Sequence, residues 1–310
     1  MTRAPARRGR LRRLAAIAVV LSLVAATVAS LAIVTDTFGA GERWEALLAK
    51  VDRFLAGPVP QRATLPTVRV TLPPSSEPTA STRATPDASG HVPSQAPTPK
   101  PKRAPVDVDI ATAPAKVFKT ELHKDWCAVA GVQIVLAQLG LADTSDATQN
   151  KLAARIREWD SYDDSHNGDW GPAAMALALK AYGAPGYEIR AFEGRNEALV
   201  DAARAIEATG SPAILLAWRG AHTWVMTGFR ADADPAVFDR NVHISGTYVL
   251  DPWFPRISSI WGASDPPGTF QDKAEMERNF LPWKRPEGLY PDRDGLFITV
   301  VPTLPAPTTG

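Results

Sequence analysis

Between Gly57 and Ala115 the chain is rich in Pro, Thr, Ser and Ala and has few large apolar side chains. Such a segment cannot bury enough apolar surface to offset the conformational entropy that folding removes. The sequence therefore predicts a disordered linker over residues 57–115, which confines any globular fold to the rest of the chain. The 28 prolines and the 45% of apolar residues fit this combination of an unstructured part and a folded part.

The N-terminal residues predict a membrane anchor. Residues 1–13 contain several arginines and predict a basic cytoplasmic tail, whereas residues 14–34 are uncharged and mostly apolar. At about 1.5 Å per residue this run spans roughly 30 Å, the thickness of a bilayer's hydrocarbon core. We therefore expect a single-pass protein of the cell membrane with a cytoplasmic N-terminus and an extracytoplasmic C-terminal domain. A cleaved signal peptide is the alternative, although the apolar run is longer than the usual signal core.

A short helix is expected next to the membrane. Within residues 35–56 the large apolar residues recur at helical spacing: Trp44, Leu47, Leu48, Val51, Phe54 and Leu55. We interpret this segment as a juxtamembrane amphipathic helix that binds the interface or associates with itself. The net charge of +1 provides no basic excess, so we expect no nucleic-acid partner. Nothing in the sequence defines an oligomeric state.

The folded domain is predicted to cover residues 116–310. Helical periodicity is present at 126–139, 146–159, 171–182 and 196–208, and β-branched and aromatic runs predict strands at 212–220, 222–231, 242–251 and 295–301. Helices followed by an antiparallel sheet are typical of an α+β domain.

The only cysteine, Cys127, falls at the predicted start of the first of these helices, with Asp125 as the expected N-cap. A thiol near a helix N-terminus or an imidazolium ionises more easily and becomes a good nucleophile. The alternative is a small buried side chain without chemistry. His222 opens a predicted strand and Asp251 ends the next one, so the two residues are suited to act as a base and its orienting carboxylate.

Two stretches of sequence carry a resemblance to a known family. "DWCAVAGVQIVLAQLG" resembles the nucleophile helix of papain-like cysteine peptidases, in particular the double-glycine leader peptidases and their stand-alone relatives. "GAHTWVMTGFRADAD" and "VHISGTYVLDPW" are similar to the later half of that family's domain. The resemblance implies a papain-like fold, a peptide or peptide-like amide as substrate and no cofactor. It also implies that Cys127 is the nucleophile, His222 the general base and Asp251 the orienting residue.

One position departs from this family. Papain-like enzymes usually have a Gln about six residues before the nucleophile, where its amide stabilises the oxyanion; this chain has Glu121. An ionised carboxylate has no hydrogen to donate. Either His123, Lys124 or the indole of Trp126 replaces the donor, or the site is slow or inactive. The backbone N–H of Cys127 remains available in each case.

Other residues were considered as parts of the site. We expect Trp218, Trp224 and Trp253 to line the cleft or the core beside it. A calcium loop starting at Asp163 lacks its final Glu, and no zinc-binding spacing is present, so no metal is expected. Residues 260–288 are expected to cover the cleft as a lid or to pack on the sheet.

The sequence thus predicts a membrane-tethered extracytoplasmic cysteine peptidase or amide hydrolase. Two alternatives remain open at this point. One is an inactive module that binds a peptide or a cell-wall component, for which Glu121 is the main argument. The other is a transglutaminase-like acyltransferase, which would need an amine as its second substrate.

Overall fold

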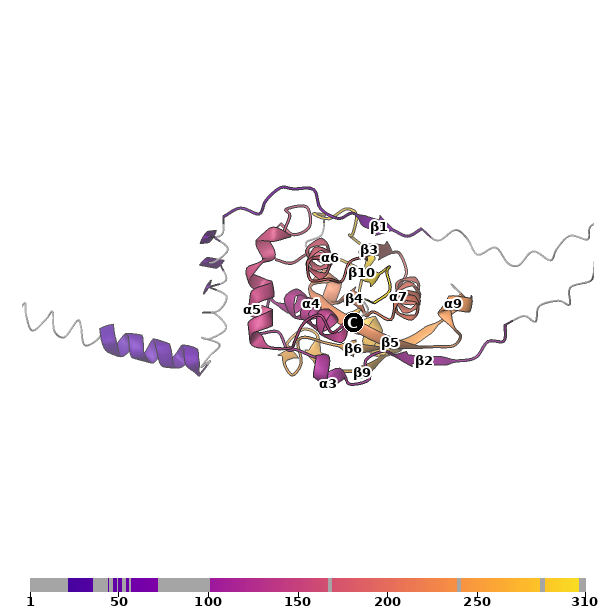
Figure 1. Ribbon diagram of the computed structural model, residues 1–310. Coiled ribbons are helices and arrows are strands. Elements are labelled where there is room, and N and C mark those ends of the chain that lie inside the picture. The colour runs from indigo at the N-terminus through magenta and orange to yellow at the C-terminus, as the bar shows by residue number, and fades with distance from the viewer. Residues whose placement is uncertain are drawn as a thin grey trace, which may run out of the picture. The chain divides into compact units, whose positions relative to one another are not determined.

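The computed structural model describes residues 22–35, 44, 47–48, 50–51, 54–55, 57–71, 101–166, 169–238, 241–284 and 288–306. The chain divides into two compact units, Met1–Pro58 and Val59–Gly310. The second unit contains the sheet and all of the elements named below (Figure 1).

The N-terminal unit corrects part of the predicted fold. Residues 22–34 are helical. In the part of the chain that the structure describes, no helix is both long and apolar enough to cross a bilayer. The fold prediction was wrong to include a transmembrane helix at 14–34; residues 14–21 of that prediction lie outside the described residues. Within the predicted amphipathic helix, residues 44, 47, 48, 50, 51, 54 and 55 are helical.

The second unit is an α+β domain with a mixed eight-stranded sheet. Seven strands follow the order β1-β3-β10-β4-β5-β6-β9. The eighth strand, β2, pairs with β5 and stands outside this order. The strands are β1 (Thr67–Arg69), β2 (Val106–Asp109), β3 (Tyr187–Phe192), β4 (Ala213–Leu216), β5 (His222–Ala231), β6 (Ile244–Leu250), β9 (Thr269–Asp272) and β10 (Phe297–Pro302). β1 runs parallel to β3 and the other pairs are antiparallel, which corrects the prediction of a purely antiparallel sheet.

Helices cover both faces of the sheet (Figure 1). The first face packs against α4 (Cys127–Gln138) and α6 (Pro172–Ala181), and the second against α7 (Arg195–Thr209). Alternation along the strands explains the two cores, because neighbouring residues point to opposite faces. In β4, for example, Ile214 belongs to the first core and Leu215 to the second. The remaining helical elements are α3 (Pro114–Val117), α5 (Asp146–Ala154), the 3₁₀ turn Ile156–Glu158, α8 (Ala217–Gly220), α9 (Pro235–Phe238) and α10 (Lys273–Asn279).

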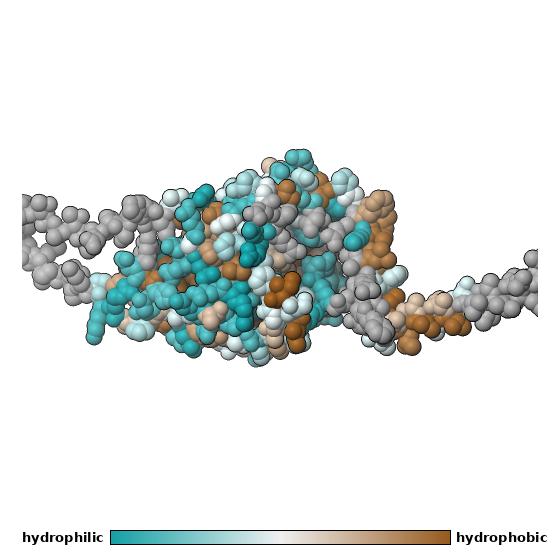
Figure 2. All heavy atoms as spheres, turned by 180° about the vertical axis from the view of Figure 1, so that it is seen from behind, coloured by the Kyte–Doolittle hydropathy of each residue, from teal (hydrophilic) through white to brown (hydrophobic). Residues whose placement is uncertain are grey.

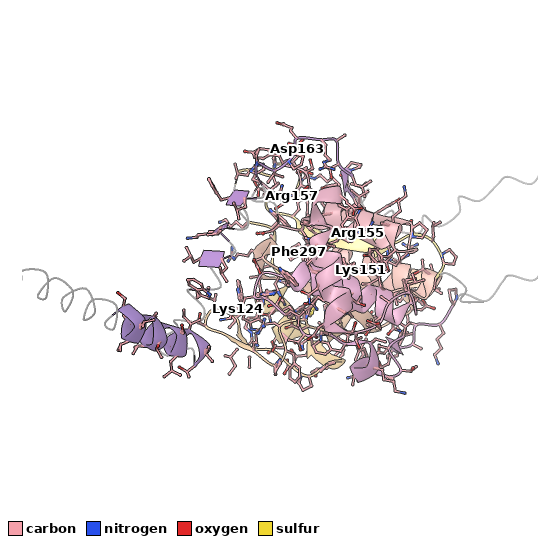
Figure 3. The ribbon with its side chains drawn as sticks, turned by 60° about the vertical axis from the view of Figure 1, so that its left-hand side comes forward. Lys124, Lys151, Arg155, Arg157, Asp163 and Phe297 are labelled. Carbon is pink, nitrogen blue, oxygen red and sulfur yellow. The ribbon has the colours of Figure 1, made fainter. Side chains whose placement is uncertain are left out.

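The helix predicted at 146–159 ends earlier than expected. α5 begins after the N-cap Ser145, whose hydroxyl accepts a hydrogen bond from the Thr148 N–H, and a 3₁₀ turn follows the helix. Arg155 closes this end because its guanidinium bonds the Glu158 carboxylate and lies 4.9 Å above the Trp159 ring. Figure 3 labels Lys151 in this helix and Arg155 directly after its last residue.

Two strands lie within the predicted linker. β1 and β2 fall inside residues 57–115 and pair with β3 and β5, far away in sequence. The compact unit consequently begins at Val59, whereas the sequence predicted a domain that starts at residue 116. Residues 72–100, between the two strands, lie outside the described residues. On the face shown in Figure 2, hydrophilic side chains cover most of the described surface and hydrophobic ones form small separate groups.

Candidate functional site

Cys127 is the first residue of α4 and is half-buried. The N-cap is Trp126 and no side chain caps the helix, so the prediction of Asp125 as N-cap was wrong. The first N–H groups of a helix have no partner within it, and the positive end of the helix dipole favours a negative charge there. The sulfur therefore lies beside the positive end of the helix dipole.

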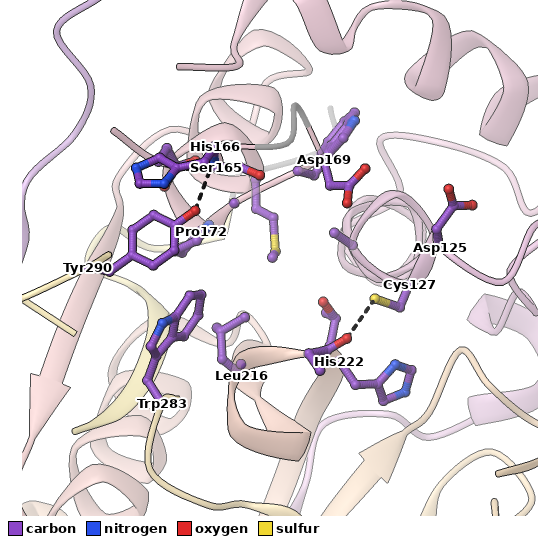
Figure 4. Close-up of a pocket in the computed structure, with 18 of the residues that line it drawn as sticks. Asp125, Cys127, Ser165, His166, Asp169, Pro172, Leu216, His222, Trp283 and Tyr290 are labelled. Atoms are coloured by element: carbon purple, nitrogen blue, oxygen red, sulfur yellow. Dashed lines mark hydrogen bonds between the residues drawn. The ribbon is translucent and has the colours of Figure 1, made fainter. Parts of the chain in front are cut away.

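α4 lies very close to β5. A Cβ atom on Gly131 would lie 2.5 Å from Cγ2 of Thr223, so only glycine permits this approach. Thr223 follows His222, and the contact therefore fixes the start of β5 against the helix that carries Cys127. The Cys127 thiol donates a long hydrogen bond of 3.9 Å to the Ala221 carbonyl (Figure 4).

His222 and Asp251 form a buried pair. The distance between Nε2 of His222 and Oδ1 of Asp251 is 2.6 Å, and the two residues are 2% and 6% exposed. The Trp253 backbone N–H donates to the same carboxylate oxygen, at 2.9 Å. The Trp218 ring stacks on the imidazole with a centroid distance of 4.0 Å and Trp253 approaches edge-on. With Nε2 bonded to Asp251, Nδ1 is the ring nitrogen left for another partner.

These neighbours control the charge of the imidazole. Burial lowers the pKa of His222, but the charge and the hydrogen bond of Asp251, together with the sulfur of Cys127, raise this pKa to about 10. The imidazolium form is thus favoured when the sulfur is a thiolate.

Glu121 completes the group around the sulfur. One carboxyl oxygen of Glu121, Sγ of Cys127 and one ring nitrogen of His222 all lie within 4.8 Å of one another. The side chain of Glu121 is fully buried, and its Oε1 accepts a hydrogen bond of 2.7 Å from Arg256. Oε2 is also buried and has no hydrogen-bond partner among the described residues. Burial raises the pKa of Glu121 to about 7, although His222 and Arg256 oppose this shift.

The segment that carries Glu121 is held from two sides. On one side the loop after β6 binds it: the Glu121 N–H donates to the Pro252 carbonyl at 3.0 Å, and Arg256 also donates to the Glu121 carbonyl. On the other side the buried Gln149 accepts from the Leu122 N–H at 2.6 Å. The same loop thus fixes both Asp251 and Glu121 relative to the sulfur.

A pocket of about 330 Å³ opens beside the sulfur. Figure 4 shows Cys127 and His222 on one side of it and His166, Trp283 and Tyr290 on the other. The pocket is lined by Lys124, Asp125, Cys127, Ala128, Asp164, Ser165, His166, Asp169, Trp170, Gly171, Pro172, Met175, Leu216, Gly220, Ala221, His222, Thr223, Trp283 and Tyr290. It has room for a side chain or a short peptide segment next to the thiol.

The far wall of the pocket comes from the end of the chain. Trp283 lies in the segment 260–288 that was predicted as a lid or as packing on the sheet, and Tyr290 follows it. The Tyr290 hydroxyl accepts a hydrogen bond from the His166 N–H at 2.9 Å. His166, Trp170, Trp283 and Tyr290 were not among the predicted site residues, and the aromatic residues around Pro282 were the available signal for the last two.

Trp218, Trp224 and Trp253 were predicted to line the cleft or the core beside it. None of Trp218, Trp224 and Trp253 lines the pocket. Trp224 is 3% exposed and belongs to the core on the α7 side. Trp218 and Trp253 instead enclose the His222 ring, and the Trp218 indole N–H donates to Asn279 at 3.0 Å.

Of the predicted oxyanion donors, His123 is exposed and its ring packs on Trp126, with centroids 4.3 Å apart. Trp126 itself is half-buried at the helix start. Lys124 lines the same pocket as Cys127, and Glu121 lies within 4.8 Å of the sulfur and of an imidazole nitrogen.

Glu, Cys and His are residue types that bind zinc, and the group around the sulfur contains one of each. Metal ligands must be deprotonated. Here Arg256 already binds the Glu121 carboxyl, and the pKa of His222 is raised. These two features favour proton chemistry over metal binding in this group.

In comparisons with known proteins, no family model, no curated protein and no solved structure matches this chain.

Proposed function

We propose that this protein is a cysteine hydrolase that cleaves a peptide or a peptide-like amide. Cys127 is the nucleophile, His222 the general acid and base, and Asp251 the residue that orients the imidazole. The observation that carries the proposal is the buried 2.6 Å hydrogen bond between His222 and Asp251, with the Cys127 sulfur within 4.8 Å of a ring nitrogen of the same histidine. This is the arrangement of nucleophile, base and orienting group that covalent acyl transfer requires.

The reaction would proceed in two steps. In the first, the thiolate of Cys127 attacks the carbonyl carbon, and the C=O electron pair moves onto the oxygen. When the tetrahedral intermediate collapses, the C–N bond breaks, His222 gives its proton to the leaving amine and a thioester remains. In the second, His222 removes a proton from water, which attacks the thioester and releases the carboxylic acid and the thiolate.

The resemblance to papain-like peptidases agrees with this assignment and remains part of the proposal. A cysteine at the start of a helix, a histidine at the start of a strand and an aspartate just after the next strand follow in the order Cys, His, Asp. The pocket beside the sulfur supports a substrate that extends past the reacting carbonyl, as a peptide does.

Thiol alkylation tests the proposal directly because Cys127 is the only cysteine. At about pH 6 an ordinary thiol is almost fully protonated, so rapid alkylation by iodoacetamide requires a thiolate stabilised by an imidazolium. We expect His222→Ala to slow alkylation at this pH by about tenfold or more and Cys127→Ser to abolish it. His243→Ala, which changes an exposed histidine, is the matched control. Equal rates for the wild type and His222→Ala would rule out an activated thiol.

A further inference from the structure

The carboxyl of Glu121 has one oxygen bound to Arg256 and one buried oxygen without a hydrogen-bond partner among the described residues. Arg256 donates to Oε1 at 2.7 Å, so a proton on this carboxyl is favoured on Oε2, which leaves Oε1 as the stronger acceptor for the guanidinium. Oε2 is buried and has no partner among the described residues. A buried polar atom without a partner is costly, so a hydrogen-bond partner for this carboxyl beside the sulfur and the imidazole would remove that cost.

The charges around this carboxyl favour its neutral form. With the sulfur and the imidazole as an ion pair, the four nearest charges cancel: Cys127 and Asp251 are negative, and His222 and Arg256 are positive. An ionised Glu121 would add an unbalanced negative charge in a buried space, and Asp125, on the loop before α4, adds to the repulsion. Burial accordingly raises the pKa of Glu121 to about 7.

We propose that Glu121 is a catalytic residue that is protonated on Oε2 and donates this hydrogen to the substrate carbonyl oxygen as it becomes an oxyanion. This role rests on the proposed function. It requires no proton transfer from Glu121: the hydrogen bond forms when the thiolate attacks and weakens again when the oxyanion returns its electron pair to carbon. The Cys127 backbone N–H, at the first position of α4, is the second donor.

A protonated Glu121 can act as the donor that papain-like enzymes usually take from a Gln at this position. A carboxylic acid that stays neutral in a buried site donates a hydrogen bond as an amide does. One donor to an oxyanion is worth about a hundred- to a thousandfold in rate. The substitution of the usual Gln by Glu therefore keeps the donor at acidic pH and loses it as the pH rises through about 7, which makes the site sensitive to pH.

Two probes that react with the same sulfur separate this role from thiol activation. p-Nitrophenyl acetate acylates the thiolate through a tetrahedral oxyanion, whereas iodoacetamide alkylates it without forming an oxyanion. The ratio of the two rates therefore cancels the fraction of thiolate and reports oxyanion stabilisation alone. In the full-length wild-type protein we expect this ratio to be constant at acidic pH and to fall about a hundredfold as the pH rises through about 7.

Variants of Glu121 complete the test. In Glu121→Ala the ratio should be about a hundredfold below the acidic wild-type value at every pH. Glu121→Gln keeps a donor that does not ionise, so its ratio should be independent of pH and about tenfold or more above that of Glu121→Ala. Glu193→Gln, which changes an exposed glutamate, is the control.

Two results would overturn this role: a wild-type ratio that does not change with pH, or a Glu121→Gln ratio as low as that of Glu121→Ala. Either result leaves the cysteine hydrolase intact if iodoacetamide still reacts rapidly at about pH 6. Slow alkylation in the wild type would instead contradict the proposed function itself.

Discussion

The imidazole of His222 is the group at this site whose charge depends most on its neighbours. It is buried, which by itself lowers its pKa, yet Asp251 and Cys127 raise this pKa to about 10. A group whose pKa is higher in the folded than in the unfolded chain stabilises the fold while it is protonated. For His222 this stabilisation is complete below about pH 6.5, its pKa in the unfolded chain, and is lost as the pH rises through about 10, its pKa in the folded protein. At neutral pH the protonated ring is therefore favoured, as the proposed ion pair with Cys127 requires.

Replacing the carboxylate should weaken this charge without removing the side chain. In Asp251→Asn the amide fills the same volume but brings no negative charge, so the pKa of His222 should fall. We expect iodoacetamide to alkylate Cys127 at about pH 6 at least about tenfold more slowly than in the wild type, with the difference shrinking at higher pH. The control is Asp163→Asn, which changes an exposed carboxylate (Figure 3). An unchanged rate at about pH 6 would mean that Asp251 does not support the imidazolium.

At the scale of residues, the sequence indicated the members of the site better than their surroundings. Order and local context led to Cys127, His222 and Asp251, and these side chains lie together; their catalytic role stays a prediction. The pairing of Glu121 with Arg256 could not be predicted, because it joins residues 135 positions apart. The protonation of Glu121 depends on burial, which a motif does not encode.

At the scale of elements, the sequence failed to predict β1, β2 and β3, whose formation depends on pairing with distant partners. No strand was predicted at β3, which lies between two predicted helices. Its sequence "YEIRAF" nevertheless alternates between buried and more exposed residues over its first four positions, as a strand does. β1 and β2 are three and four residues long and lie in a Pro-rich stretch. Their extended structure comes from partners more than a hundred residues away, and strand propensity depends strongly on such context. Trp224 likewise lies in the core because alternation along β5 sets its face.

The pairing of β2 with β5 can be tested at Gly228. A Cβ atom there would lie 2.0 Å from the Val108 carbonyl oxygen, so the side chain and β2 cannot keep their places together. We expect Gly228→Ala to lower the free energy of unfolding by on the order of 1–3 kcal/mol. Urea denaturation measures this loss. Hydrogen exchange should show faster exchange of the β2 amides, and unchanged protection of residues 106–109 would contradict the pairing.

At the scale of the whole molecule, the strands before residue 116 belong to the domain that carries the site. Arg62 donates to the carbonyl of Arg157 at 2.9 Å and contacts the Asp160 carboxylate, whose side chain is fully buried. In β1, the Thr67 hydroxyl accepts a hydrogen bond of 3.1 Å from Arg293, which also pairs with the buried Asp164. Composition predicted a linker here because these partners are distant in sequence.

Two fragments decide where the domain begins. The fragment 59–310 retains β1 and β2, whereas the fragment 116–310 starts at the boundary predicted from composition and lacks both strands. The shorter fragment leaves residues 228–231 of β5 without their β2 partner and removes Arg62 from Asp160. With each backbone hydrogen bond worth about 1 kcal/mol, we expect it to be less stable by at least about 3 kcal/mol in urea denaturation. The fragment 101–310, which keeps β2 alone, separates the two contributions and should lie between the others. If 116–310 were as stable as 59–310 and alkylated as fast at Cys127, the strands would be dispensable and the domain would begin where the composition changes.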